Sequence, residues 1–129
     1  MENSALKLIM EKYASLDMFE GYDIRSPESP GQDGDSPFHM VAYDGDISAA
    51  KLMLPYISNI NFGGDNGNSP LHYAVMHKKP EMARFLISNG ADVTAKNDYG
   101  DTPIEYMEDD EVFRVVLTEL KRDKGPGSD

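Results

Sequence analysis

Two histidines stand in the same local pattern and are the residues of this chain best suited to acid–base or metal chemistry. His39 and His72 each lie three residues after a serine and two after a proline, and 33 positions separate them. A fixed interval of this length is typical of stacked repeat units. Equivalent residues of such units lie roughly 10 Å apart, too far to share a metal ion. We therefore predict a structural role for both histidines.

The remaining candidates for chemistry are carboxylates and a third histidine. Asp109 and Asp110 with His77 have the residue types of an acid–base site, and segment 65–68, Asp-Asn-Gly-Asn, has oxygens suited to calcium. However, the sequence has no nucleophile elbow, phosphate-binding glycine loop or His-Glu-x-x-His motif. Segment 65–68 also lacks the ligand spacing and the distant glutamate of a calcium loop. We predict no enzyme activity, no metal site and no cofactor.

The pattern around the histidines recurs at a constant interval. Segment 68–74, Asn-Ser-Pro-Leu-His-Tyr-Ala, has counterparts 33 residues earlier and 33 residues later. A glycine two residues before each Ser or Thr keeps the same interval, at Gly34, Gly67 and Gly100. The period, the turn glycine and the Ser/Thr-Pro-apolar-His core resemble the ankyrin repeat, over about three-quarters of the chain.

The resemblance implies an all-α fold: an ankyrin-repeat solenoid of stacked helix-turn-helix units with hairpin-like turns and capping units at both ends. In this family the histidine equivalent to His39 and His72 hydrogen-bonds backbone between neighbouring repeats. Gly90, within Asn-Gly-Ala-Asp-Val, matches the end of a repeat's second helix and would adopt the left-handed conformation that stops it.

The repeat register divides the chain into five parts. We predict an N-terminal capping helix and acidic loop at 1–30, repeats at 31–63 and 64–96, a truncated third repeat at 97–122 and a disordered tail at 123–129. The order of the acidic loop stays open, because long loops are either functional or disordered.

Local signals place the helices within these units. Ser36 and Ser69 each precede a proline, which suits a helix N-cap followed by a first helical residue without an N–H. Thr102 and Glu105 form a capping box in the third unit, where glutamate replaces histidine. Pro55 is expected to end or kink the second helix of the first repeat.

Composition restricts the partners. The 129 residues include 23 acids and 12 bases, a formal net charge of −11, and no cysteine. Nucleic acid and anionic membranes are unlikely partners, since both require a basic surface, whereas a basic protein would be complementary. The alternative is that the acidity only maintains solubility. The only apolar run near the N-terminus is too short and too charged for an export signal, which favours a cytoplasmic location.

The family register also yields a candidate partner-binding surface. In ankyrin folds the ligand usually meets the hairpin tips and the outer side of each first helix, which together form a concave face. The corresponding residues are Asp33, Asp35, Met40, Tyr43, Asp44, Asp65, Asn66, Tyr73, Met76, His77, Asp98, Tyr99, Asp101, Tyr106 and Asp109. None is Lys or Arg, and tyrosines beside acids suit the recognition of Lys and Arg side chains. The alternative is that the tyrosines cover helix packing and the acids solubilise the tips.

These observations predict a non-catalytic protein-protein interaction module, present as a monomer or in complex with its partner. We expect a small acidic inhibitor or adaptor that masks a basic partner protein through its concave face. The alternative is a bacterial immunity protein that neutralises a cognate basic toxin such as a nuclease. A more remote alternative is a self-associating assembly subunit, which its mass in solution would reveal.

Overall fold

The computed structural model describes residues 4–124, and all regular structure in that range is helical. The α-helices are α1 (Ser4–Ala14), α2 (Pro37–Asp44), α3 (Ile47–Met53), α4 (Pro70–Met76), α5 (Pro80–Ser88), α6 (Pro103–Glu108) and α7 (Arg114–Lys124). Short 3₁₀ helices are η1 (Asp17–Phe19), η2 (Leu54–Tyr56), η3 (Asp65–Gly67) and η4 (Glu111–Phe113).

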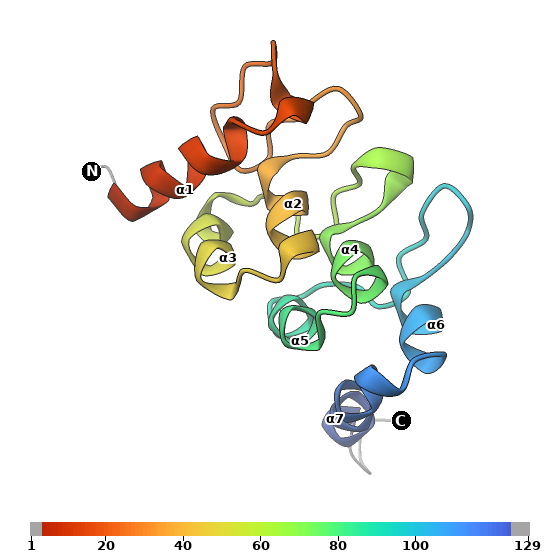
Figure 1. Ribbon diagram of the computed structural model, residues 1–129. Coiled ribbons are helices and arrows are strands. Elements are labelled where there is room, and N and C mark those ends of the chain that lie inside the picture. Colours follow the sequence, from red (N-terminus) through yellow and green to blue (C-terminus); the bar gives the residue numbers. More distant parts are fainter. Residues whose placement is uncertain (1–3, 125–129) are drawn as a thin grey trace.

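The helices form two rows, as Figure 1 shows. The first helices of the repeats, α2, α4 and α6, pack side by side, and the second helices α3, α5 and α7 form the other row. Helix α1 packs against α3 and α2, so it occupies the place of a second helix at the N-terminal end. The all-α solenoid predicted from the sequence is confirmed.

A hairpin-like turn precedes each first helix, and the three turns share one hydrogen-bond pattern. The N–H groups of Gly31, Gly64 and Asn97 each donate to the carbonyl four residues later, at 2.8, 2.9 and 3.0 Å. The turn glycines 34, 67 and 100 have φ values of 95°, 70° and 81°. At Gly67 a Cβ would also lie 2.4 Å from the Asp98 carboxylate, so only glycine fits there.

The helix boundaries follow the local signals in the sequence. Ser36, Ser69 and Thr102 each accept a hydrogen bond from the backbone N–H three residues later, and a proline follows each as the first helical residue. Helix α3 gives way to η2 at Leu54, directly before Pro55. That is where a proline ring disfavours further helical geometry.

The core lies between the two rows of helices and runs the length of the stack. Its largest fully buried apolar residues are Tyr13, Phe38, Met53, Leu71, Met82, Leu86, Met107 and Phe113. Burying a Leu, Phe or Met side chain contributes about 1.5–3 kcal/mol. Because each repeat buries its apolar side chains mostly against its neighbours, the stack is expected to fold as one unit.

Both ends of the stack differ from the sequence prediction. Helix α7 continues through Lys124, two residues into the segment predicted as a disordered tail, and residues 125–129 lie outside the described part. Val112 and Val115, in the apolar segment predicted as the last helix, are 44% and 62% exposed, because no other element within residues 4–124 covers this side of α7. On α1 only Tyr13 is buried, and Leu8 is 67% exposed.

The acidic loop before the first repeat is folded against the body. Phe19 is buried, and a Cβ added to Gly31 would lie 2.6 Å from its ring. The Phe38 N–H donates to the Pro27 carbonyl at 3.0 Å. Glu28 accepts hydrogen bonds from the backbone N–H and the hydroxyl of Ser58, at 2.6 and 2.8 Å. These contacts attach the loop to the end of the first repeat.

Candidate functional site

The buried histidines connect each first helix to the next hairpin turn. His39 Nδ1 accepts the Ser36 backbone N–H at 3.1 Å, so the ring proton is on Nε2, which donates to the Phe62 carbonyl at 2.9 Å. His72 accepts the Ser69 N–H at 3.0 Å in the same way, and its Nε2 donates at 2.9 Å to the carbonyl of Asp101, the last residue of the next turn, whereas Phe62 lies just before its turn.

Burial lowers the pKa of both imidazoles, which are therefore neutral at pH 7. Each neutral ring has its acceptor nitrogen and its donor nitrogen occupied by backbone groups. Neither ring is open to a substrate or a metal ion. Within residues 4–124 the structure places no three His, Asp or Glu side chains close enough together to hold a metal ion.

The three turn tips, residues 32–34, 65–67 and 98–100, lie on one side of the molecule, and we call them the hairpin edge (Figure 1). Hydrogen bonds join them: the Asp65 N–H donates to the Asp35 carboxylate, and the Asp98 N–H donates to the Asn66 carbonyl, both at 2.9 Å. Two backbone-anchored contacts therefore fix the spacing of the tips.

Asp35 and Tyr73, which the sequence places in the contact set, are both buried. The Tyr73 hydroxyl donates to the two carboxylate oxygens of Asp35 at 2.8 and 2.9 Å, across 38 residues of sequence. Burial and the adjacent carboxylate raise the pKa of Tyr73 far above its ordinary value, so the hydroxyl keeps its proton. Their side chains lock the first turn onto α4 and are not presented to a partner.

The outer side of the first helices carries a small aromatic group. The rings of Tyr43 and His77 lie 3.7 Å apart, centroid to centroid, and both are within 6.3 Å of the Tyr73 ring. Tyr43 is 42% exposed. His77 was expected from its position to be exposed, but this stacking leaves it half-buried. Met40 and Met76, which the repeat register also placed in the candidate set, are half-buried too.

The third unit carries the most accessible part of the candidate set. Tyr99 is 70% exposed, and Asp98 and Asp109 are exposed as well. Tyr106 is half-buried, and its hydroxyl donates to the Asp101 carboxylate at 2.9 Å. Tyr99 is therefore the most accessible aromatic side chain of the third unit.

Negative charge is concentrated at the hairpin edge. Partial burial raises the pKa of the Asp65 carboxyl, and the charges of Asp35, Asp33 and Asp98 raise it further. This mutual repulsion shows that the acids of all three turns act on one another. The hairpin edge contains no Lys or Arg, so no positive charge within it offsets the negative charge of these acids.

The sequence reasoning missed one base at the border of this surface. Lys78 follows α4 with φ 58° and pairs with Asp110 at 3.5 Å. The sequence did indicate an unusual backbone conformation here, because Lys78 occupies a position where the ankyrin pattern usually has glycine, the residue suited to positive φ.

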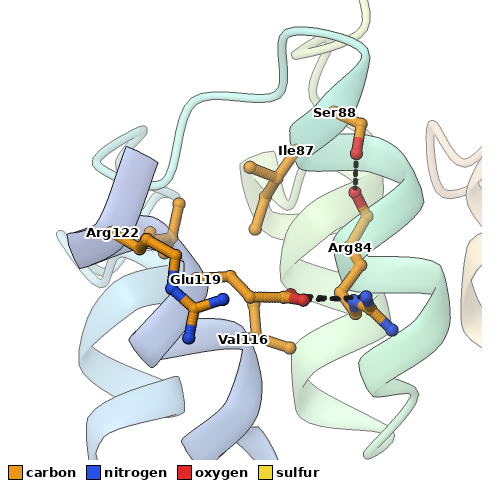
Figure 2. A pocket seen from close by; sticks show the side chains of 7 residues that line it. Arg84, Ile87, Ser88, Val116, Glu119 and Arg122 are labelled. Atoms are coloured by element: carbon orange, nitrogen blue, oxygen red, sulfur yellow. Dashed lines mark hydrogen bonds and ion pairs between the residues drawn. The ribbon is translucent and has the colours of Figure 1, made fainter. Parts of the chain in front are cut away.

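A groove of about 480 Å³ lies on the opposite side, between α5 and α7 (Figure 2). Arg84 spans it and donates from Nε and Nη2 to the two Glu119 carboxylate oxygens, both at 2.8 Å, while Nη1 donates to Glu81. These carboxylates neutralise Arg84, and the other base that lines the groove is Arg122 of α7.

Paired helices, hairpin turns and stacked repeats define an α-solenoid, an architecture that presents an extended surface. A family model for ankyrin repeats in three copies matches residues 3–97, so the chain belongs to the ankyrin repeat family. Members of this family are in general non-catalytic protein-protein interaction modules. No curated protein matches the chain.

The family match covers α1 through α5 and stops where the third hairpin turn begins. No helix within residues 4–124 combines the length and the apolar content that a membrane span requires.

Proposed function

We propose that this protein masks a basic patch on a partner protein, acting as a small cytoplasmic inhibitor or adaptor through its hairpin edge and the adjoining first helices. The observation that carries the proposal is the hairpin edge itself. It gathers Asp33, Asp65 and Asp98 beside the exposed ring of Tyr99 and holds no base. Such a surface attracts cations over a distance and offers an aromatic face on which a guanidinium or ammonium group can lie.

The exposed members of the set form the proposed contact surface. At the hairpin edge these are Asp33, Asn66, Asp98 and Tyr99, and on the first helices they are Tyr43, Asp44 and Asp109. Other members of the set are half-buried and would contribute less contact area: Met40, Asp65, Met76, His77, Asp101 and Tyr106. Asp35 and Tyr73 act indirectly, because they position the first two turns.

A bacterial immunity protein that neutralises a basic toxin is one concrete form of this function. It would use the same surface, and the two forms differ only in the partner. Recovery of a nuclease as the bound protein, with loss of its activity in the complex, would identify the immunity form. Recovery of a non-toxic basic protein would identify an inhibitor or adaptor.

The test begins with co-purification from the native source and identification of the bound protein by mass spectrometry. Association kinetics are then measured over a range of salt concentrations. Steering between opposite charges is screened over about 8 Å at physiological ionic strength, so the association rate should fall steeply as salt rises. Asp98→Asn should slow association, and Tyr99→Ala should speed dissociation and weaken binding by about 2 kcal/mol or more.

Glu11→Gln is the matched control, because Glu11 is an exposed acid on α1 and belongs to neither the hairpin edge nor the proposed contact residues of the first helices. It removes the same charge as Asp98→Asn and should leave affinity within about 0.5 kcal/mol. If Glu11→Gln weakens binding as much as Asp98→Asn, or if Tyr99→Ala has no effect, the hairpin edge is not the contact surface.

A further inference from the structure

Helix α7 is a basic element in an acidic protein. Its eleven residues hold four of the chain's 12 bases and two of its 23 acids. It closes the C-terminal end of the described stack, packing on α6 and α5 with Val116 buried. The remainder of the chain is therefore more acidic than its composition as a whole indicates.

The exposed residues of α7 form one continuous face. Arg114, Val115, Thr118, Lys121 and Arg122 are all exposed, and at 3.6 residues per turn they fall within an arc of about 120°. We call these five residues the α7 face. Val115, at one edge of this arc, is its apolar residue and is 62% exposed.

Two bases of the α7 face lack an ion-pair partner among residues 4–122, the part of the chain whose side chains the structure describes. Arg114 pairs with Glu111 one turn earlier. Lys121 and Arg122, in contrast, have no acid within ion-pair distance among residues 4–122. This face thus offers two unneutralised cations beside an exposed apolar side chain.

We propose that the α7 face docks onto the hairpin edge of a second copy of this chain. The two surfaces are complementary in charge: Lys121 and Arg122 would meet the acids of the three turn tips. They are also complementary in chemistry, because the exposed ring of Tyr99 provides a stacking surface for the Arg122 guanidinium.

End-to-end stacking of two solenoids is the competing mode of self-association, and charge opposes it. The exposed residues of α1 include Lys7, Leu8 and Lys12. Placing α1 of one copy on α7 of another would bring bases against bases, which costs free energy at an interface. Helix α1 also contains no arginine to stack on Tyr99.

The contact proposed here is heterologous, since it joins different surfaces of the two copies. It involves no other protein, so a failed test of self-association would leave the proposed function untouched, and the reverse also holds. Because both would use the hairpin edge, self-association would compete with the binding of a basic partner.

Sedimentation equilibrium of the purified chain tests the association directly. The monomer mass is 14.3 kDa. At an ionic strength of about 0.01 M, where the Debye length is about 30 Å, the average mass should rise with protein concentration. At about 1 M, where that length is about 3 Å, it should return to the monomer value. A monomer at every concentration in low salt overturns the proposal.

Charge reversal identifies the surface. Lys121→Glu with Arg122→Glu should raise the dissociation constant about tenfold or more. The matched control is Lys7→Glu with Lys12→Glu on α1, which changes net charge by the same amount and should have a much smaller effect. Equal effects of the two double variants would mean that net charge alone governs association, and the α7 face would be excluded.

A mixing experiment establishes which surfaces meet. The α7 double variant keeps the hairpin edge, and Asp33→Asn with Asp98→Asn keeps α7, so each should be monomeric alone. Mixed in equal amounts, they should form 1:1 dimers that grow no further, because only one complementary pair of surfaces remains. A mixture that stays monomeric excludes a head-to-tail contact between these surfaces.

Discussion

The two buried histidines should make the free energy of unfolding of this protein depend on pH over the range in which imidazole titrates. Burial lowers the pKa of His39 and His72 in the folded state, whereas in the unfolded chain a histidine titrates near pH 6.5. Below that value the unfolded chain takes up protons that the folded protein does not. Their stabilising effect is therefore fully present above about pH 6.5 and is lost as pH falls through the folded-state pKa values.

Linkage sets an upper limit on the size of this effect. A histidine that stays neutral in the fold lowers the free energy of unfolding by at most about 1.4 kcal/mol between about pH 7.5 and about pH 5.5. The two together account for at most about 2.8 kcal/mol. With a urea m-value of about 1–3 kcal/mol/M, the midpoint should fall by about 1 M or more if both stay neutral. Carboxylates titrate near pH 4 in the unfolded chain and contribute little above about pH 5.5.

Urea melts across this window are the assay, with His39→Gln and His72→Gln as separate variants. Each variant should be less stable at pH 7.5 and should lose about half of the pH dependence. His77→Gln should keep most of it, because His77 is only half-buried. Nitrogen NMR should find the proton of both buried rings on Nε2. A stability that does not change with pH, or a pH dependence that survives in both variants, would refute the reasoning.

Four further substitutions test the packing, each measured by urea melts unless stated. Leu71→Ala should cost about 2–5 kcal/mol, because Leu71 is 1% exposed; a loss below about 1 kcal/mol would mean that the site is not core. Tyr73→Phe should cost about 1.5–3 kcal/mol, since it removes the hydroxyl donor of a buried carboxylate, and Tyr106→Phe should cost less, at a half-buried one. Glu28→Gln should speed amide exchange within the acidic loop, and unchanged exchange would mean that its bonds to Ser58 do not hold the loop.

Features determined by neighbouring residues could be predicted from the sequence. Ser36, Ser69 and Thr102 cap their helices through the backbone N–H three residues on, a distance that sequence patterns resolve. The break before Pro55 follows from the geometry of one ring. The stacked architecture followed from the 33-residue period, because a repeating sequence demands a repeating contact.

Contacts between distant residues could not be predicted in the same way. Nothing local to Tyr73 indicates that its hydroxyl bonds to Asp35, 38 residues away. The repeat register alone placed both residues in the predicted contact set. A register gives the position of a residue along the repeat, but it does not give the direction in which the side chain points. Similarly, the apolar segment 112–120 does not show by itself which of its residues are buried: Val116 is, whereas Val115 is 62% exposed.

The glutamate at position 105 has a consequence for the length of the solenoid. His39 and His72 each send an N–H to the next turn, whereas Glu105 accepts two hydrogen bonds from Thr102, both at 2.8 Å, and has no proton to donate onward. A histidine here would direct a donor to a position where the described chain has no following turn. Extending the protein by a grafted repeat would therefore require Glu105→His together with a new turn to accept its N–H. Position 105 is therefore a single residue at which the hydrogen bonding between neighbouring repeats can be changed in longer versions of the array.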